Sequence, residues 1–295
     1  MEEEFDLFGN KIVKDVLLRD RFLEPPFSVL DTRGGEWQER KQAWQGVGIQ
    51  SELGRDAGCM PEWSKGELDE KGLDKYGRKP MTHISIFDPA LTELMYRWFC
   101  PDGGTILDPF AGGSVRGIVA NYLGFKYTGL ELREEQVTSN RQQALNILPL
   151  ERQPIWHIGD SDKTLDTLEE KFDFIFSCPP YFDLEVYSDL PDDISNMDYP
   201  GFIAKYRSII AKAVTRLKPG GFACFVVGDI RDKKGFYRDF VGDTRRAFVE
   251  AGAGFYNDAV LVNSVGTACL RAAKVFEAGK KLTKIHQNVL VFKKG

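Results

Sequence analysis

The pattern of hydrophobic and polar positions divides the chain near residue 80. Residues 1–80 are rich in charge, glycine and tryptophan and show little strand pattern. From residue 81 onward, short apolar runs alternate with segments of helical periodicity. Alternation of this kind predicts a doubly wound, Rossmann-like α/β domain over residues 81–295, with a mostly parallel sheet. Residues 1–80 are predicted to form an N-terminal extension.

The apolar runs after residue 80 give the expected order of elements. Strands are expected at 105–108, 127–131, 155–158, 172–177, 222–228, 257–262 and 287–293. Helices are expected at 89–99, where Asp88 precedes Pro89 as a cap, and at 114–123, 134–146, 162–170, 200–217 and 238–251. The last apolar run follows a loop instead of a helix, which allows an antiparallel final strand.

Composition and charge limit the classes of protein that fit. The net charge of −5 argues against indiscriminate coating of nucleic acid, but a local basic patch is compatible with it. The five cysteines show no CxxC pair, and His83, His157 and His286 lack metal-ligand spacing, so neither a disulfide framework nor a metal site is expected. No run of about 18 apolar residues occurs, and the acidic start does not resemble a signal peptide. We therefore expect a cytoplasmic protein.

Acidic residues follow three successive predicted strands. Asp108 precedes the small-residue turn Pro109-Phe110-Ala111-Gly112-Gly113, where glycines allow a ligand to approach the backbone and a helix start offers free N–H groups. Glu131 can accept both hydroxyl hydrogens of a ribose, and Asp160 can accept a hydrogen bond from an adenine amine. Taken singly, these features also fit a tight turn, a solvated carboxylate and a helix cap.

The tetrad Cys178-Pro179-Pro180-Tyr181 follows the apolar strand 172–177. Two prolines fix a rigid turn and leave the first proline's carbonyl outside any helix or ladder. An aromatic ring comes next, so an acceptor and a stacking surface lie together at the carboxyl end of a strand, where open α/β sheets bind ligands. This corner suits a flat heterocycle that carries an amino group on its edge.

In combination and order, these segments resemble S-adenosylmethionine-dependent DNA methyltransferases that modify N6 of adenine or N4 of cytosine. Four segments carry the resemblance. Leu107–Gly113 resembles the cofactor motif of these enzymes, which usually reads DPFxGxG, and His83–Cys100 resembles the helix-bearing segment before it. Ser177–Tyr181 resembles their catalytic motif, and His286–Phe292 resembles their last strand. The resemblance covers about residues 81–295. More loosely, Pro26–Arg55 and the whole arrangement are similar to stand-alone methylases of phages and prophages.

The resemblance implies a role for each motif. Asp108 and the turn Pro109–Gly113 hold the methionine part of S-adenosylmethionine, Glu131 holds its ribose and Asp160 its adenine. The target base is flipped out of double-stranded DNA into the pocket. There Tyr181 stacks on the base and the Pro179 carbonyl accepts a hydrogen bond from its amine, with Ser177, Cys178 and Pro180 completing the catalytic motif.

One position departs from this family's pattern. Its members have Asp, Asn or Ser before the two prolines, whereas Cys178 has a weakly accepting thiol. Ser177 precedes it and, on a strand, points to the opposite side. Three alternatives follow. The turn is remodelled so that Ser177 accepts from the target amine, or the Pro179 carbonyl is nearly the sole acceptor for that amine. In the third, Cys178 attacks C6 of cytosine for methylation at C5. A cofactor-binding, DNA-binding module without catalysis is a further alternative.

Contacts with DNA are expected from a basic stretch between the last two predicted strands. Residues 263–286 have an excess of four positive charges, with candidate phosphate contacts at Arg271, Lys274, Lys280 and Lys281. A solvated charged loop fits equally well. The acidic stretch 183–198 is expected to be a mobile loop that does not face phosphates. Residues 1–80 are a candidate for sequence recognition through Arg33, Trp37, Arg40, Lys41 and Trp44, but the tryptophans also fit packing onto the catalytic domain.

Overall fold

The computed structural model describes residues 18–50, 87–182, 190, 192–266 and 268–295. Within them, eight strands form one sheet in the order β1-β7-β8-β6-β5-β2-β3-β4. The strands are β1 (Val29–Asp31), β2 (Thr105–Asp108), β3 (Lys126–Glu131), β4 (Ile155–Ile158), β5 (Phe172–Ser177), β6 (Leu217–Val227), β7 (Ala253–Val262) and β8 (His286–Lys294). Only β8 runs antiparallel to its neighbours, β6 and β7, which confirms the predicted antiparallel last strand.

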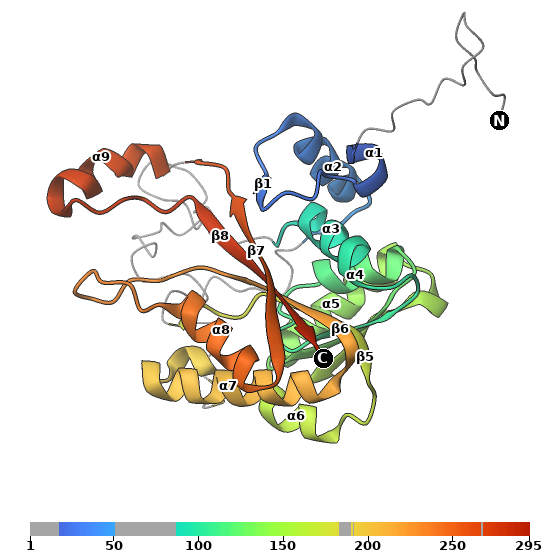
Figure 1. The fold of residues 1–295 in the computed structure, drawn as a ribbon. Helices are drawn as coiled ribbons and strands as arrows, with labels where there is room; N and C mark the ends of the chain where they lie inside the picture. The colour runs from blue at the N-terminus through green and yellow to red at the C-terminus, as the bar shows by residue number, and fades with distance from the viewer. Residues whose placement is uncertain (1–17, 51–86, 183–189, 191, 267) are drawn as a thin grey trace, which may run out of the picture.

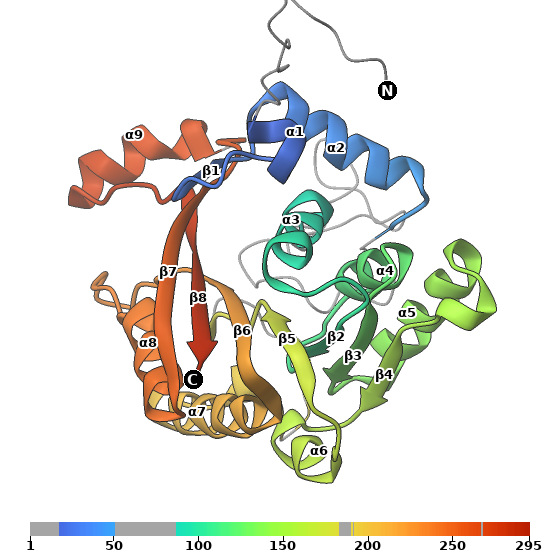
Figure 2. The same cartoon turned by 45° about the vertical axis from the view of Figure 1, so that its right-hand side comes forward.

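Helices cover both faces of the sheet (Figures 1 and 2). They are α1 (Leu18–Phe22), α2 (Gly35–Gly46), α3 (Pro89–Phe99), α4 (Val115–Tyr122), α5 (Glu134–Ile147), α6 (Ser161–Thr167), α7 (Tyr199–Arg216), α8 (Phe240–Glu250) and α9 (Ala268–Gly279). Figure 2 shows α3, α4 and α5 on one side of the sheet and α6, α7 and α8 on the other. No helix in the described part of the chain has the length and apolarity needed to cross a bilayer.

Alternation along the buried strands supplies both hydrophobic layers. In β5, Phe174 and Phe176 pack with α3 and α4, and Ile175 packs with the helices of the opposite face. Tyr96 of α3 meets both phenylalanine rings edge-on at 6.2 and 5.5 Å. Since successive side chains of a strand point to opposite faces, one apolar run fills two cores. The carboxyl ends of the central strands are thereby fixed between two packed layers.

The described part of the N-terminal extension is built into this domain. β1 pairs in parallel with β7, which makes it the edge strand of the sheet. The indole groups of Trp37 and Trp44 are buried, and they donate to Asp88 at 3.1 Å and to Glu93 at 2.9 Å, both on or beside α3. These two tryptophans therefore pack onto α3 and the residue that caps it, which is packing as one of the two interpretations of the sequence described.

The basic side chains proposed for recognition in this extension have acidic partners within the chain. Arg33 pairs with Asp31, Arg40 with Glu93 and Lys41 with Asp88, at 2.7, 3.3 and 3.6 Å. His83 and residues 51–80 lie outside the described residues.

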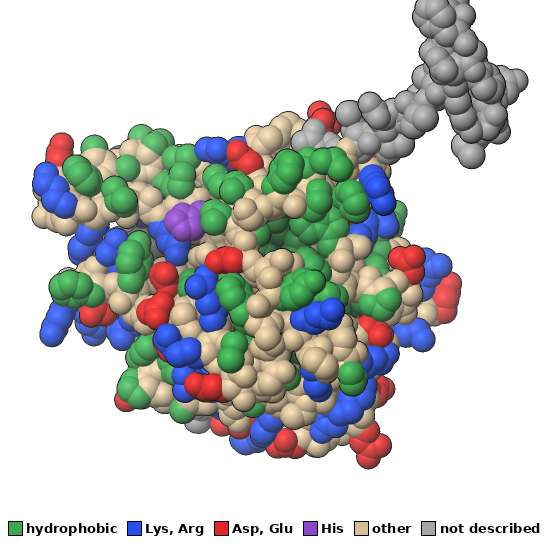
Figure 3. Space-filling model, in the orientation of Figure 1, with side chains coloured by type: hydrophobic (Ala, Val, Ile, Leu, Met, Phe, Trp, Pro, Cys, Tyr) green, Lys and Arg blue, Asp and Glu red, His purple; other side chains and the backbone are tan. Residues whose placement is uncertain are grey.

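Helix α9 differs from the charged loop expected between the last two strands. It projects from the end of β7 as an arm, and none of its described side chains is buried. Hydrophobic side chains stand beside Lys and Arg side chains on this arm (Figure 3). The segment is nevertheless amphipathic at helical spacing, so its hydrophobic pattern favoured a helix that the charge-based interpretation of this stretch overlooked.

Candidate functional site

A pocket opens at the carboxyl ends of β5, β2, β3 and β4. It brings together most of the residues that the sequence singled out. Its wall includes Pro109, Phe110, Gly112 and Gly113 from the turn after β2, Glu131 and Asp160 from the next strand ends, and the corner residues Cys178, Pro179, Pro180 and Tyr181. Four motifs that are distant in the sequence therefore share one cavity. Asp108, Ala111 and Ser177 are buried beneath it and do not line its wall.

Asp108 organises the turn from below. Its Oδ1 accepts from Ser177 Oγ at 2.6 Å and from the Phe110 N–H at 3.2 Å. Its Oδ2 accepts from Arg116 Nε at 2.6 Å and from the Tyr127 hydroxyl at 2.8 Å. Desolvation acts to lower the pKa of Arg116, yet the adjacent Asp108 carboxylate raises it above its ordinary value. Asp108 and Arg116 thus form a buried ion pair that shapes the cofactor turn, and the Asp108 carboxylate does not face the cavity.

The backbone of the turn after β2 is held by the side chains of Arg116 and Glu131. Arg116 Nη2 donates to the carbonyls of Phe110 and Ala111 at 2.7 and 2.9 Å. Gly112 has φ = 51°, the left-handed region that glycine adopts without a β-carbon clash, and its N–H donates to Glu131 Oε2 at 2.9 Å. The Glu131 carboxylate is therefore fixed against the turn while it lines the pocket.

The beginning of α4 presents free donors to the same cavity. Among the described residues, no group accepts a hydrogen bond from the N–H of Gly113, Ser114 or Val115. Gly113 and Val115 both line the pocket. Unpaired amides at a helix N-terminus attract an anionic group such as a carboxylate.

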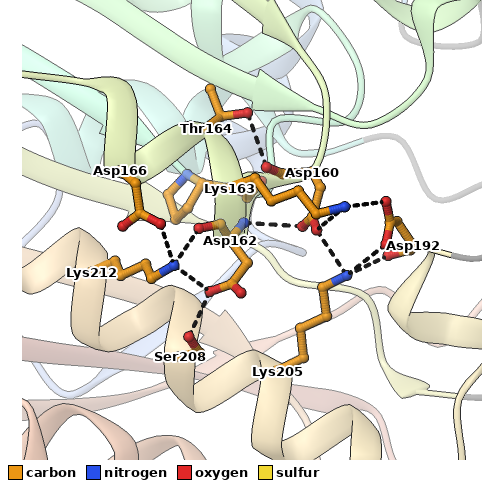
Figure 4. Close-up of polar contacts among 11 residues, drawn as sticks. Asp160, Asp162, Lys163, Thr164, Asp166, Asp192, Lys205, Ser208 and Lys212 are labelled. Atoms are coloured by element: carbon orange, nitrogen blue, oxygen red, sulfur yellow. Dashed lines mark hydrogen bonds and ion pairs between the residues drawn. The ribbon is translucent and has the colours of Figure 1, made fainter.

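The Asp160 carboxylate has three partners among the described residues, one of which is Lys163, with its Nζ 3.8 Å from Oδ2 (Figure 4). Its Oδ1 accepts from the Asp162 N–H at 3.0 Å, which caps α6, and its Oδ2 lies 3.0 Å from Lys205 Nζ of α7. Lys205 also donates to the Asp192 backbone carbonyl at 3.0 Å, and Lys163 pairs with the Asp192 carboxylate at 2.8 Å. The helix cap considered from the sequence is thus present. Asp192 is drawn to the pocket by two lysines.

The acidic residues around Asp192 also have structural partners. Asp193 caps the short helix η5 (Ile194–Asn196) and Asp198 caps α7. Residues 183–189 and 191 of the predicted mobile loop lie outside the described residues. Asp192, Asp193 and Ile194 line the pocket beside Asp160.

Ser177 and Cys178 point to different sides of the chain at the end of β5. Ser177 Oγ donates to Asp108 and accepts from the Phe110 N–H at 3.2 Å, so its hydroxyl serves the turn and not the pocket. Cys178 lines the pocket, with its sulfur 3.9 Å from the Tyr181 hydroxyl. A remodelled turn in which Ser177 faces a target amine is therefore not what the structure contains.

The Tyr181 ring is fixed in the wall of the pocket. Its hydroxyl accepts from the Gln287 amide and donates to the Val226 carbonyl at 3.4 Å. Phe182, directly after it, has φ = 52°, and its ring packs into the hydrophobic core on the side of the sheet that α7 and α8 cover. A left-handed conformation is rare for a bulky residue, and here it turns the backbone so that adjacent rings enter the pocket and the core.

The Pro179 carbonyl differs from the other groups of the corner in its hydrogen bonding. No described residue donates a hydrogen bond to this oxygen, although the proline itself is buried and lines the pocket. A buried carbonyl oxygen without a partner is unusual in a folded protein. This carbonyl is therefore available to a ligand that carries a donor.

Several residues that shape the site were not singled out from the sequence. Gln287 holds Tyr181, Arg116 holds the turn, and Lys205 connects Asp160 with Asp192. Arg116 was detectable in principle, since a charged residue within the apolar pattern of residues 115–122 signals a buried pair. The contacts of Gln287 and Lys205 depend on tertiary packing alone. Arg271, Lys274, Lys280 and Lys281 lie on or after α9 and do not line the pocket.

Comparisons with known proteins show what this architecture is similar to. No protein-family model matches the chain, and no curated protein sequence matches it. A solved structure of a candidate RNA methyltransferase from Pyrococcus horikoshii superimposes with a TM-score of 0.50 at 14% identity, covering 87% of this chain and 98% of that one. The chain has a Rossmann-like methyltransferase fold.

Two further solved structures are more distant. TrmN from Thermus thermophilus has a TM-score of 0.46 at 16% identity, covering 70% of this chain and 49% of that one, so the matched region spans about half of TrmN. Magnesium protoporphyrin IX methyltransferase from Synechocystis, solved with bound S-adenosylmethionine, has a TM-score of 0.41 at 13% identity, covering 66% and 71%. At such identities the likeness concerns the methyltransferase fold and leaves the substrate undetermined.

Proposed function

We propose that this chain transfers a methyl group from S-adenosylmethionine to an exocyclic amine of a DNA base, N4 of cytosine or N6 of adenine. The observation that carries the proposal is the Pro179 carbonyl, for which no described residue supplies a donor and which belongs to one pocket with the fixed ring of Tyr181. An acceptor beside an aromatic surface matches a planar base whose edge carries an amino group. The base must leave the duplex to reach this pocket, so base flipping is part of the proposal.

The pocket fits S-adenosylmethionine as the methyl donor. The free amides at the start of α4 suit its carboxylate, Glu131 suits the ribose hydroxyls, and Asp160 with the apolar wall around Ile194 suits the adenine. When bound, this cofactor supplies an electrophilic methyl group on a sulfonium. Glu131 and Asp160 each accept from internal donors at fixed positions, which holds both carboxylates in the wall of the pocket.

The residues of the corner orient the acceptor base. Tyr181, held by Gln287, offers its ring for stacking, and the Pro179 carbonyl accepts one hydrogen of the amine. This hydrogen bond favours a geometry in which the nitrogen lone pair leaves conjugation with the ring. Orientation and electrostatic fit then supply most of the rate gain, and the chain needs no separate strong base.

The test is methyl transfer from isotopically labelled S-adenosylmethionine to DNA of mixed sequence, read by mass spectrometry of the nucleosides. We expect labelled N4-methylcytosine or N6-methyladenine. Tyr181→Ala should lower kcat/KM roughly 10- to 100-fold, because stacking on one aromatic ring contributes about 1–3 kcal/mol. Tyr256→Ala is the matched control, since Tyr256 is exposed and lies near the opposite edge of the sheet. Labelled 5-methylcytosine alone, or transfer that survives Tyr181→Ala unchanged, would contradict the proposal.

A further inference from the structure

The ammonium group of Lys284 lies beside the corner, and no described carboxylate lies within ion-pair distance of it. The side chains of Lys284 and Tyr181 both approach Gly228. A β-carbon at this position would lie 3.7 Å from Lys284 Nζ and 3.8 Å from Cε2 of Tyr181. Within the described residues, Lys284 forms neither a hydrogen bond nor an ion pair. Desolvation lowers its pKa, and Asp229 opposes that shift only from a distance.

Two further cations surround this position. The Arg231 guanidinium stacks 3.8 Å from the centre of the Tyr237 ring, and Lys284 Nζ lies 5.9 Å from the same ring. Arg231 also donates to the Gly235 carbonyl at 2.7 Å, and the Lys281 ammonium lies against Gly235. None of these three cations forms an ion pair with a described residue. We call Arg231, Lys281 and Lys284 the basic wall.

The residues of the basic wall do not line the cavity, but they lie at the same edge of the sheet as the cavity. Arg231 follows the carboxyl end of β6, and Lys284 precedes β8, where Gln287 reaches Tyr181. On the opposite side of the cavity, the charges of Glu131, Asp160 and Asp192 are balanced by arginine and lysine partners. The basic wall has no such ion pairs among the described residues, so a phosphate is attracted to this side.

A half-buried ammonium is costly to leave unpaired, because it gives up part of its hydration without an opposing charge. We propose that Lys284, supported by Arg231 and Lys281, binds a phosphate of the DNA strand next to the flipped nucleotide. The inference rests on the proposed function. It narrows the basic stretch 263–286 to Lys284 and Lys281 and adds Arg231, which the sequence did not assign. Lys284 is a binding residue here and takes no part in methyl transfer.

Salt-dependent DNA binding tests the proposal. Wild-type chain, Lys284→Met and the control Lys126→Met are titrated against a fluorescent DNA duplex of mixed sequence over a range of salt concentrations. We expect Lys284→Met to weaken binding to all sequences and to reduce the slope of log K against log salt by about 0.9, the value for one lost phosphate contact. Lys126 is exposed at the amino end of β3, on the opposite edge, so its replacement should change neither quantity.

Lys284→Arg should restore the slope, since it keeps the charge, and thermal unfolding of each variant checks that the fold is retained. An unchanged slope for Lys284→Met, or no binding of wild-type chain to DNA, overturns the proposal. Methylation of free deoxynucleotides that depends on Lys284, without an effect on DNA, assigns the phosphate to a nucleotide and also overturns it. If wild-type chain binds DNA but transfers no methyl group, the proposed function fails, and the binding result stands separately.

Discussion

Adjacent residues of the corner have different environments, and this difference bears on the chemistry. Ser177 is buried and bonded to Asp108, whereas Cys178 borders the pocket near the Tyr181 hydroxyl. Because a thiol is a weak acceptor, the Pro179 carbonyl is the stronger acceptor at the corner. Amine methylation then does not require the sulfur, whereas methylation at C5 requires it as nucleophile.

Replacement of Cys178 separates these two chemistries. Cys178→Ala should retain labelled N4-methylcytosine or N6-methyladenine within several-fold of wild type, and Cys178→Ser, which supplies a hydroxyl acceptor, should match or exceed it. Nucleoside mass spectrometry after transfer to DNA measures both variants. Formation of 5-methylcytosine by wild-type chain, together with its loss in Cys178→Ala, would instead identify the thiol as the nucleophile.

The buried pair Asp108–Arg116 should be costly to break. Arg116→Met leaves the Asp108 carboxylate buried without its counterion, so we expect a loss of about 3–5 kcal/mol in the free energy of unfolding. Urea unfolding measures it, with Arg246→Met as control. Arg246 is half exposed and pairs on the surface, where one ion pair contributes about 1 kcal/mol or less. Equal losses in both variants would show that the pair does not hold the turn.

At the scale of elements, the sequence predicted the strands and helices whose apolar side chains face a hydrophobic core. The strand 172–177 and the helix 89–99 with its Asp88 cap were predicted with the bounds that the structure has, because their apolar positions fill cores and their ends are capped. The short edge strand β1 and the arm α9 were missed. β1 has only three residues, too few to show a period. Residues 268–279 do carry an amphipathic helical pattern, which was overlooked because this stretch was interpreted by its charges.

Packing between elements should also set the affinity for the cofactor. Lys205→Met removes the link from α7 to Asp160 and Asp192, and we expect the Kd for S-adenosylmethionine to rise about tenfold, or about 1.4 kcal/mol. Lys212→Met is the control on the same helix, because Lys212 pairs with Asp162 and Asp166, which do not line the pocket. Calorimetric titration measures both. A similar Kd for the two variants would contradict this role of Lys205.

In the whole molecule, residues 29–46 pack onto the same sheet and helices that carry the pocket. β1 extends the sheet, and Trp37 and Trp44 cover α3. The sequence left packing and DNA recognition as alternatives for this region, since a tryptophan pattern alone does not say which surface covers it. The assembly of four strand-end motifs into one cavity was predictable, because parallel strands place their carboxyl ends on one edge.

Removal of residues 1–50 should therefore destabilise the domain. The truncated chain loses the edge strand and exposes the apolar face of α3, so we expect a clearly lower Tm and aggregation on heating. Circular dichroism during thermal unfolding measures this change. An unchanged Tm with altered sequence preference would show instead that residues 1–50 form a separable recognition module.

The most direct test of the central claim is the nucleoside composition of DNA from cells that express this chain. We predict N4-methylcytosine or N6-methyladenine above the level in cells with an empty vector, and a strong reduction in cells that express Tyr181→Ala at equal protein level. Only 5-methylcytosine above the control, or no additional methylated base, would contradict amine methylation of DNA.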